Sequence, residues 1–566
     1  MKNTSVLVAV IALTGVLVTS CSSLRKMKKH AGEITYAVTP ETLTAKGGTV
    51  DLKVDITFPK QYFNKKVSLE ATPVLRFNGG EKSFAMKAMQ GEKVVGNSEV
   101  VSYTAGKTVT YTSQISYEDA MRLSTLDIDI VGFKGLKSLA FTPRQIANGV
   151  VATATMVDNK PRPVLGDDNF QQVIKEQKEA SIYYLINSAE LREKEISSAD
   201  IKNLETFVRE RAESIGTHLN SIDIRSYASP DGPLGLNEKL ADRREAGSTS
   251  FLKKKLKSEA LLSLFNQYVV AEDWDGFQKA LENSNIQDKE LILRVLSMHT
   301  DPEVREREIK NIASAFTVIA EQILPKLRRS LIVANAERAG KSTIELRSLA
   351  QTNPSDLTAD ELLYAATLFD GQGDKLSIYR TAARLYPNDW RGFNNVGVIL
   401  LETNDVTEAK ANFTRASMLL QNNKVVQNNL GAIALREGDL QQASIYLGNA
   451  TGAGQEVEYN KGILAILGGD YPAATRYLGS AQTPNAALAQ ILAGNYNEAT
   501  KCLATDNSAL GYYLKAVIGA RVNNTQMLTD NLKKAVTMKS SYKQTAATDL
   551  EFVRYFETPE FAAIVR

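Results

Sequence analysis

Cysteine and histidine are scarce in this chain. Its 566 residues include two cysteines, Cys21 and Cys502, and three histidines, His30, His218 and His299. A structural zinc site takes four such ligands, and histidine is the side chain most often used for acid–base catalysis. The scarcity argues against zinc sites, disulfide frameworks and histidine-dependent enzymes.

A charge excess is also missing. Lys plus Arg number 67 and Asp plus Glu number 64, so the formal net charge is only +3. This balance creates no global field that would recruit nucleic acid, and no nucleic-acid partner is expected. Apolar residues make up 43% and charged residues 23%, the usual balance of a globular chain. At about 100–200 residues per domain, the length predicts three to five domains.

An apolar run from Val6 to Val18 lies near the amino terminus. It is too short to span about 30 Å of hydrocarbon but long enough for the core of a signal peptide. It ends in a Val-Thr-Ser-Cys sequence that resembles the lipobox of bacterial lipoproteins. The resemblance implies that residues 1–20 are removed and that Cys21 is acylated, so that a lipid bilayer is one partner. The alternative is a plain secretory signal with an incidental cysteine.

Residues 21–33 form a basic stretch that is expected to be a solvated linker near anionic lipid head groups. In lipoproteins of the Bacteroides type, export to the cell surface is associated with acidic residues just after the cysteine, and none occurs here. The resemblance therefore implies a lipid-anchored outer-membrane protein that faces the periplasm.

Residues 34–158 are rich in Val, Thr, Ile and Tyr and are interrupted by Gly and Pro. Thr49 to Ile56 alternate strictly between polar and apolar residues, which is typical of a half-buried strand. The spacing predicts one antiparallel β-sandwich, with an immunoglobulin-like fold as the model. Such a domain would bind a partner along an edge strand or act as a spacer, and the sequence does not choose between these roles.

Residues 164–340 change to alternating strands and helices, and part of this region resembles the OmpA-like C-terminal domain family. The positions that carry the resemblance are Tyr227, Ala228, Ser229, Gly232, Asn237, Leu240, Ala241 and Arg244. A closing strand with a double arginine, Arg328 and Arg329, also fits the family pattern. The resemblance implies an α/β domain that binds peptidoglycan, in which an aspartate and Arg244 clamp the zwitterionic end of diaminopimelate. The residues between about 258 and 325 are expected to be a helical insertion.

Ser229 stands where the family has its ligand-binding aspartate. A hydroxyl supplies no compensating charge for an ammonium group, although Asp231 lies two residues further along the same loop. The candidate peptidoglycan-binding residues are Tyr227, Ser229, Asp231, Asn237 and Arg244. The alternatives are that the module is purely structural and that Arg244 is an ion-pairing residue on a helix surface.

The last third of the chain, residues 357–566, shows a period of 34 residues. Positions that share this spacing are Ala382, Ala416 and Ala450; Tyr379, Phe413 and Leu447; Gly397 and Gly431; and Ala409 and Ala443. The pattern resembles the tetratricopeptide repeat (TPR), and it predicts an all-α solenoid with a carboxy-terminal cap. The concave surface of such an array binds segments of other proteins, and its candidate groove residues are Arg391, Asn394, Asn428 and Arg436.

The fold expected is thus multidomain α+β: a β-sandwich, an OmpA-like α/β domain with a helical insertion, and a TPR solenoid. No Ser/His/Asp set, paired-carboxylate motif or metal-ligand spacing is present, so neither an enzyme nor a cofactor is expected. The function expected is a membrane-anchored adaptor that links membrane and peptidoglycan to a protein partner. The alternative is an assembly scaffold for a secretion, fimbrial or surface-glycan system that does not bind peptidoglycan.

Overall fold

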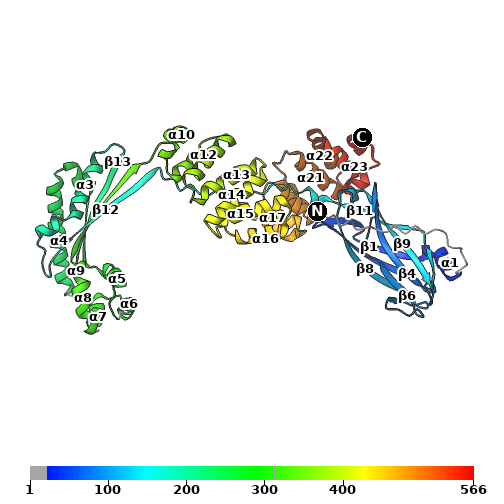
Figure 1. Cartoon of the computed structure of the whole chain (residues 1–566), viewed down its shortest axis with the longest axis horizontal. Coiled ribbons are helices and arrows are strands. Elements are labelled where there is room, and N and C mark those ends of the chain that lie inside the picture. Colours follow the sequence, from blue (N-terminus) through cyan, green and yellow to red (C-terminus); the bar gives the residue numbers. More distant parts are fainter. Residues whose placement is uncertain (1–21, 231, 288, 312) are drawn as a thin grey trace, which may run out of the picture. The chain divides into compact units, whose positions relative to one another are not determined.

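The computed structural model describes residues 22–566 except 231, 288 and 312 (Figure 1). Cys21, expected to be lipidated, and Asp231 lie outside the described residues. The chain divides into two compact units. The first unit combines the chain up to Asp167 with Asp370–Arg566, and the second unit is Asp168–Phe369. Along the sequence, the second unit therefore lies between the two parts of the first.

The segment after Cys21 differs from the expected solvated linker. Residues Ser22–Lys29 form helix α1, and both Leu24 and Met27 on it are buried in the core of the following domain. Because these two residues are three positions apart, they share one face of the helix, while the basic residues cover the other faces. None of the helices in the described part of the chain has the length and hydropathy needed to cross a bilayer.

Two layers of strands follow α1 in the first unit. One layer contains β1 (Thr35–Thr39), β2 (Thr42–Lys46), β3 (Thr49–Phe58) and β8 (Lys107–Ser116). The other contains β4 (Ser68–Phe77), β5 (Gly80–Ser83), β6 (Lys87–Gly91), β7 (Glu99–Val101), β9 (Ser124–Lys134), β10 (Lys137–Ala140) and β11 (Arg144–Val151). β2 joins the two layers, since it pairs with both β3 and β11.

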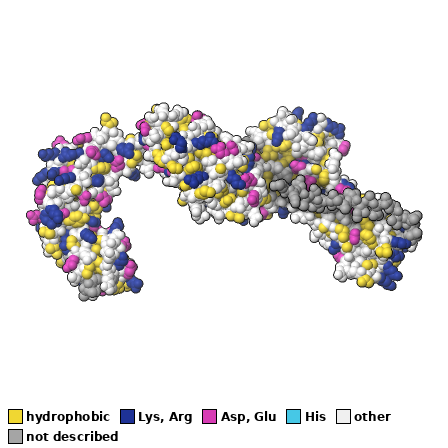
Figure 2. All heavy atoms as spheres, in the orientation of Figure 1, with side chains coloured by type: hydrophobic (Ala, Val, Ile, Leu, Met, Phe, Trp, Pro, Cys, Tyr) yellow, Lys and Arg dark blue, Asp and Glu magenta, His cyan; other side chains and the backbone are white. Residues whose placement is uncertain are grey.

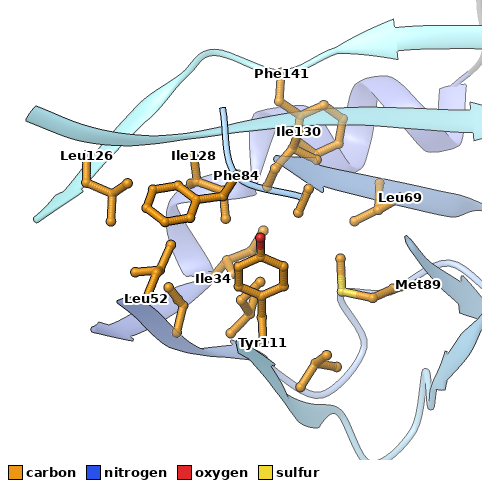
Figure 3. Close-up of a cluster of buried hydrophobic side chains, with 14 of the residues drawn as sticks. Ile34, Leu52, Leu69, Phe84, Met89, Tyr111, Leu126, Ile128, Ile130 and Phe141 are labelled. Carbon is orange, nitrogen blue, oxygen red and sulfur yellow. The ribbon is translucent and has the colours of Figure 1, made fainter. Parts of the chain in front are cut away.

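The core of this sandwich lies between the layers. Side chains from strands on both sides, such as Leu52 and Ile128, point toward one another (Figure 3). The expectation of an antiparallel sandwich is wrong at two places, because β2 runs parallel to β11 and β6 runs parallel to β7.

The second unit contains a four-stranded sheet in the order β12 (Val173–Tyr183), β15 (Arg329–Ala339), β13 (Thr217–Ala228) and β14 (Phe265–Glu272). β13 and β14 are parallel, and the other two pairs are antiparallel. Helices α3 (Ala199–Glu213) and α4 (Leu234–Leu256) pack on this sheet, where Leu204 and Leu252 join Ile224 and Ile332 in one core.

The expected helical insertion at 258–325 begins instead with a strand of the sheet, β14. Its helices follow: α5 (Trp274–Glu282), α6 (Lys289–Met298), α7 (Pro302–Asn311), α8 (Ala313–Gln322) and α9 (Leu324–Leu327). They enclose a small core of their own that includes Phe277, Ile292 and Ile323. β14 escaped prediction because five consecutive residues of it, Asn266 to Val270, are exposed, so no inward–outward alternation marks it.

Two helices, α10 (Thr343–Thr352) and α11 (Ala359–Thr367), complete the second unit. The solenoid expected from residue 357 thus has its first helix in the second unit.

The remaining helices of the first unit are α12 (Gln372–Leu385), α13 (Trp390–Glu402), α14 (Val406–Leu419), α15 (Lys424–Glu437), α16 (Leu440–Asn449), α17 (Gln455–Leu467), α18 (Tyr471–Leu478), α19 (Pro484–Leu492), α20 (Tyr496–Cys502), α21 (Ala509–Arg521), α22 (Thr525–Met538), α23 (Ser541–Thr548) and α24 (Pro559–Val565). They pair as α13 with α14, α15 with α16, α17 with α18, α19 with α20, and α21 with α22, which is the TPR-like arrangement. The glycines of the 34-residue period allow close helix contact. A Cβ atom on Gly431 would lie 2.7 Å from the Leu447 side chain, and one on Gly397 would lie 2.6 Å from the Phe413 ring.

Candidate functional site

An extended segment of the chain lies along the first helices of the repeats. Residues 158–167, which we call the strap, have no helix or strand and connect the sandwich to the second unit. Hydrogen bonds tie the strap to α13, α15, α17 and α19, helices that follow it by more than 220 residues. The concave groove expected for an external partner is thus occupied by the protein's own backbone.

One asparagine from each of these helices holds one strap residue through both of its backbone groups. We call them the clamp asparagines: Asn395 holds Gly166, Asn429 holds Val164, Asn460 holds Arg162, and Asn485 holds Asp158. In each pair the side-chain oxygen accepts the backbone N–H at 2.7–2.8 Å. The side-chain NH₂ donates to the carbonyl of the same residue, at 2.8–2.9 Å in three pairs and 3.4 Å for Gly166. An amide side chain suits this task because it offers a donor and an acceptor side by side.

The repeat places these asparagines. Asn395, Asn429 and Asn460 each stand two residues before a glycine of the helix contact, Gly397, Gly431 or Gly462. That glycine faces the second helix of its repeat. The asparagine two residues before it therefore lies at a fixed angle from the glycine around the helix axis, on the side that faces the strap. Neighbouring repeats therefore hold alternate residues of an extended chain, 162, 164 and 166, which recur every ~6.6 Å along its axis.

A second row of amides supports the clamps. Asn394 donates to the Val164 carbonyl at 3.1 Å, and Asn428 donates to the Arg162 carbonyl at 3.1 Å. The rows are also joined to each other, since Asn429 donates to Asn394 at 2.8 Å. All of these amides are buried, so a fully satisfied network fixes their orientations.

Two aromatic residues, Tyr459 and Trp390, lie against the strap. The guanidinium of Arg162 lies 3.9 Å from the centre of the Tyr459 ring, and the Tyr459 hydroxyl accepts a hydrogen bond from Asn485 at 3.0 Å. Burial raises the pKa of Tyr459, so it stays neutral. Gly166 lies against Trp390, where an added Cβ would come within 3.0 Å of the indole ring.

Arg391 ends the groove beside Trp390. It donates to the Asp167 carbonyl at 3.0 Å and pairs with Asp389 at 2.6 Å. Burial by itself would raise the pKa of the Asp389 carboxyl, but the hydrogen bonds from Arg391 hold that pKa below its usual range.

The four residues predicted for the groove thus have different surroundings. Arg391, Asn394 and Asn428 all donate to strap carbonyls. Arg436 instead donates to Asn404 and lines a cavity of about 540 Å³ between the repeats and strap residues 158–163.

Sequence patterns did not lead to a prediction of the four clamp asparagines, Tyr459 or the strap itself. The Asn-x-Gly sequence at 395, 429 and 460 was the available signal for the clamps, and Pro161 and Pro163 were a signal for an extended segment.

Arg244, in the OmpA-like part of the second unit, is fully buried. It donates to three backbone carbonyls, those of Ser188 at 2.9 Å, Tyr227 at 2.8 Å and Leu185 at 3.2 Å. Its guanidinium also lies 4.9 Å from the Tyr184 ring. The interpretation of Arg244 as a residue of the helix surface is therefore wrong, because it ties α4 to the ends of two strands.

Two other candidates for peptidoglycan binding, Ser229 and Asn237, belong to a polar cluster. Asn237 donates to the carbonyls of Ser229 and Gly232 and to the Glu272 carboxylate at 3.1 Å. Arg328 donates to the Ser229 hydroxyl at 3.0 Å. Glu272 is a further member of this cluster, and no motif in the sequence pointed to it.

Tyr227 is half-buried near this cluster, and burial raises its pKa. Its ring lies 5.6 Å from the Arg329 guanidinium, which pairs with the buried Asp273 at 2.8 Å.

The charged and metal-ligating side chains of the described residues are dispersed. On the face shown in Figure 2, basic and acidic side chains of the described residues are interspersed over each unit. Within the described part of the chain, no group of three or more His, Cys, Asp and Glu side chains is arranged to hold a metal ion. Cys502 is buried, and burial raises the pKa of its thiol.

No protein-family model and no curated protein matches the chain. Several solved structures are similar to parts of it. A tetratricopeptide repeat protein from Parabacteroides merdae is 14% identical over 37% of this chain and 91% of its own, with a TM-score of 0.29. YrrB, described as a TPR protein with an unusual peptide-binding site, is 16% identical over 36% of this chain and 97% of its own, with a TM-score of 0.22.

The hetero-tetramer of Cut9 and Hcn1 from the APC/C provides a third match. It is 12% identical over 65% of this chain and 73% of the matched chain, with a TM-score of 0.32. Since these scores are low, the assignment of TPR-like repeats rests on the chain's own 34-residue period and its helix pairing.

Proposed function

We propose that this chain is a non-enzymatic assembly scaffold whose TPR-like array holds an extended segment of protein. One observation carries the proposal: four asparagines of successive repeats hold both backbone groups of four residues in an extended chain. Paired hydrogen bonds from asparagine side chains recognise a protein backbone without reference to most of its side chains. They make and break no covalent bond.

Acylation of Cys21 would tether this scaffold to a membrane. The support is the lipobox sequence alone, and the outer membrane with a periplasmic orientation is the expected location. Fractionation of cells that express wild type or Cys21→Ala tests the tether. The wild type should sediment with membranes and the variant should not, whereas equal sedimentation of the two would refute lipid anchoring through this residue.

A retained protein partner is the direct test of a scaffold. The full-length chain is crosslinked in cells, extracted in detergent after muramidase digestion, and purified. A scaffold should keep a defined partner in near-stoichiometric amount after the wall is digested. If only the chain itself is recovered, the proposal fails.

Peptidoglycan binding is a second candidate, supported by the cluster of Ser229, Asn237, Glu272 and Arg328. These groups offer both charge signs to a zwitterionic ligand. Sedimentation with purified peptidoglycan should pellet the wild type but not Glu272→Gln, and the matched control Glu290→Gln on α6 should behave as wild type. If the wild type stays in the supernatant, this candidate is excluded.

A further inference from the structure

The sequence of the strap matches the groove residue by residue. Its clamped positions, 158, 162, 164 and 166, need a backbone N–H, and the prolines Pro161 and Pro163 occupy unclamped positions between them. Proline has no N–H, so it is compatible only with the unclamped positions. Each proline also favours an extended conformation in the residue before it, which prepares the segment for the groove.

Two side-chain contacts add selectivity to this backbone recognition. At position 162 the Tyr459 ring favours a cation, because the guanidinium lies over the ring face. At position 166 the close approach of Trp390 and Arg391, 3.0 and 3.1 Å from an ideal Cβ, favours glycine. The groove thus suits a segment of the pattern Pro-Arg-Pro-x-x-Gly, in which the first x, at the clamped position 164, is any residue except proline and the second is any residue.

The strap is held mainly by polar contacts. Of its side chains, that of Pro161 is buried, whereas those of Lys160, Arg162, Leu165 and Asp167 are exposed, Leu165 to 40%. The cavity of about 540 Å³ beside residues 158–163 also shows that the strap does not fill the groove completely. Since water can replace hydrogen bonds but not buried apolar contact, such a segment is easier to release than a packed strand.

We infer that the strap is a resident competitor, and that the groove receives an extended Pro-Arg-Pro-x-x-Gly segment of a partner protein in its place. This inference rests on the proposed scaffold function and names the chemistry of its partner. The strap is covalently attached, so it competes at an effective concentration of about 1 mM or more. A partner present at micromolar concentration therefore needs either much tighter binding or a loosened strap.

A peptide of residues 157–167, fluorescently labelled, provides the probe. Fluorescence anisotropy measures its binding to the full-length wild-type chain and to the double variant Val164→Pro/Gly166→Pro, which removes two clamped N–H groups from the strap. The double variant should bind the peptide at least tenfold more tightly than the wild type. The matched control Leu165→Pro changes a residue between the clamped positions and should bind as weakly as the wild type.

Variants of the groove and the peptide test the recognition itself. Adding Asn395→Ala and Asn429→Ala to the double variant should weaken peptide binding at least tenfold. In the peptide, Arg162→Ala and Gly166→Leu should each weaken binding, because they remove the cation and introduce a clash with Trp390. If the double variant does not fold, Val164→Pro alone is measured in the same way.

The inference is overturned if the opened groove does not bind the peptide, or if Asn395→Ala and Asn429→Ala leave binding unchanged. A concentration-dependent dimer of the wild type, detected by light scattering, would show strap exchange between copies and would overturn the assignment to a different protein. These outcomes are separate from the scaffold proposal. A crosslinked partner retained equally by wild type and by Asn395→Ala/Asn429→Ala would support the scaffold and refute the groove as its site.

Discussion

Replacing Asn429 by alanine should loosen the strap without unfolding the array. Asn429 accepts the Val164 N–H at 2.7 Å and donates to the Val164 carbonyl and to Asn394, both at 2.8 Å. The Val164 carbonyl keeps a bond from Asn394, so the Val164 N–H is the strap group that loses its acceptor. A buried group left without a partner costs about 1–3 kcal/mol.

Hydrogen–deuterium exchange measures this loss directly. Since 1.36 kcal/mol corresponds to a factor of ten, the amides of residues 157–167 should exchange about 5- to 150-fold faster in Asn429→Ala than in the wild type. Amides of the α15–α16 pair should exchange at nearly unchanged rates, because their helix contacts through Gly431 and Leu447 remain.

Gln441→Ala is the matched control, because it truncates an exposed amide on α16. It should leave strap exchange at the wild-type rate. Unchanged strap exchange in Asn429→Ala would refute the reasoning that the clamp asparagines hold the strap. Equally faster strap exchange in both variants would indicate general loosening of the array, and would also refute the reasoning that the clamp asparagines hold the strap.

Three other substitutions have defined outcomes. Gly431→Ala places a Cβ 2.7 Å from Leu447, so calorimetry should show the repeat transition destabilised by about 1–3 kcal/mol. Arg244→Ala leaves three carbonyls without a buried donor and should lower the melting temperature of the second unit, whereas exposed Arg243→Ala should not. Burial raises the pKa of Asp549 to about 6, above its unfolded value near 3.8, so its contribution to stability is fully present below pH 4 and is lost as pH rises through 6. The wild type should therefore lose about 3 kcal/mol of unfolding free energy between pH 4 and pH 7 through this group, and Asp549→Asn should not show that loss. Urea unfolding at the two pH values measures the difference.

Much of the array could be predicted from the sequence. The 34-residue spacing of Gly397 and Gly431 and of Ala382, Ala416 and Ala450 predicted helix pairs, because small residues at fixed intervals are needed where helices touch. The alternation in Thr49 to Ile56 likewise predicted β3, whose residues alternate between the core and the outer face.

The errors occurred where a local pattern was weak or had two explanations. The basic residues of 22–29 suggested a solvated linker, and the short apolar face of Leu24 and Met27 was overlooked. Strand β14 had no alternation because it lies at the sheet edge with most of its residues exposed. Arg244 was correctly placed on a helix, but its burial depends on carbonyls of β13 and of the segment that follows β12, which the fold brings to it.

The sequence by itself determined most of the helices and strands and the repeat, since these depend on residues that are near one another along the chain. Only the tertiary structure decided that the groove is occupied, and by which segment. Val164 and Asn429 are 265 residues apart, and the contact between them uses the backbone N–H and C=O of the strap. Nearly every residue carries those two groups, so a pairing made through them leaves little trace in the amino-acid sequence.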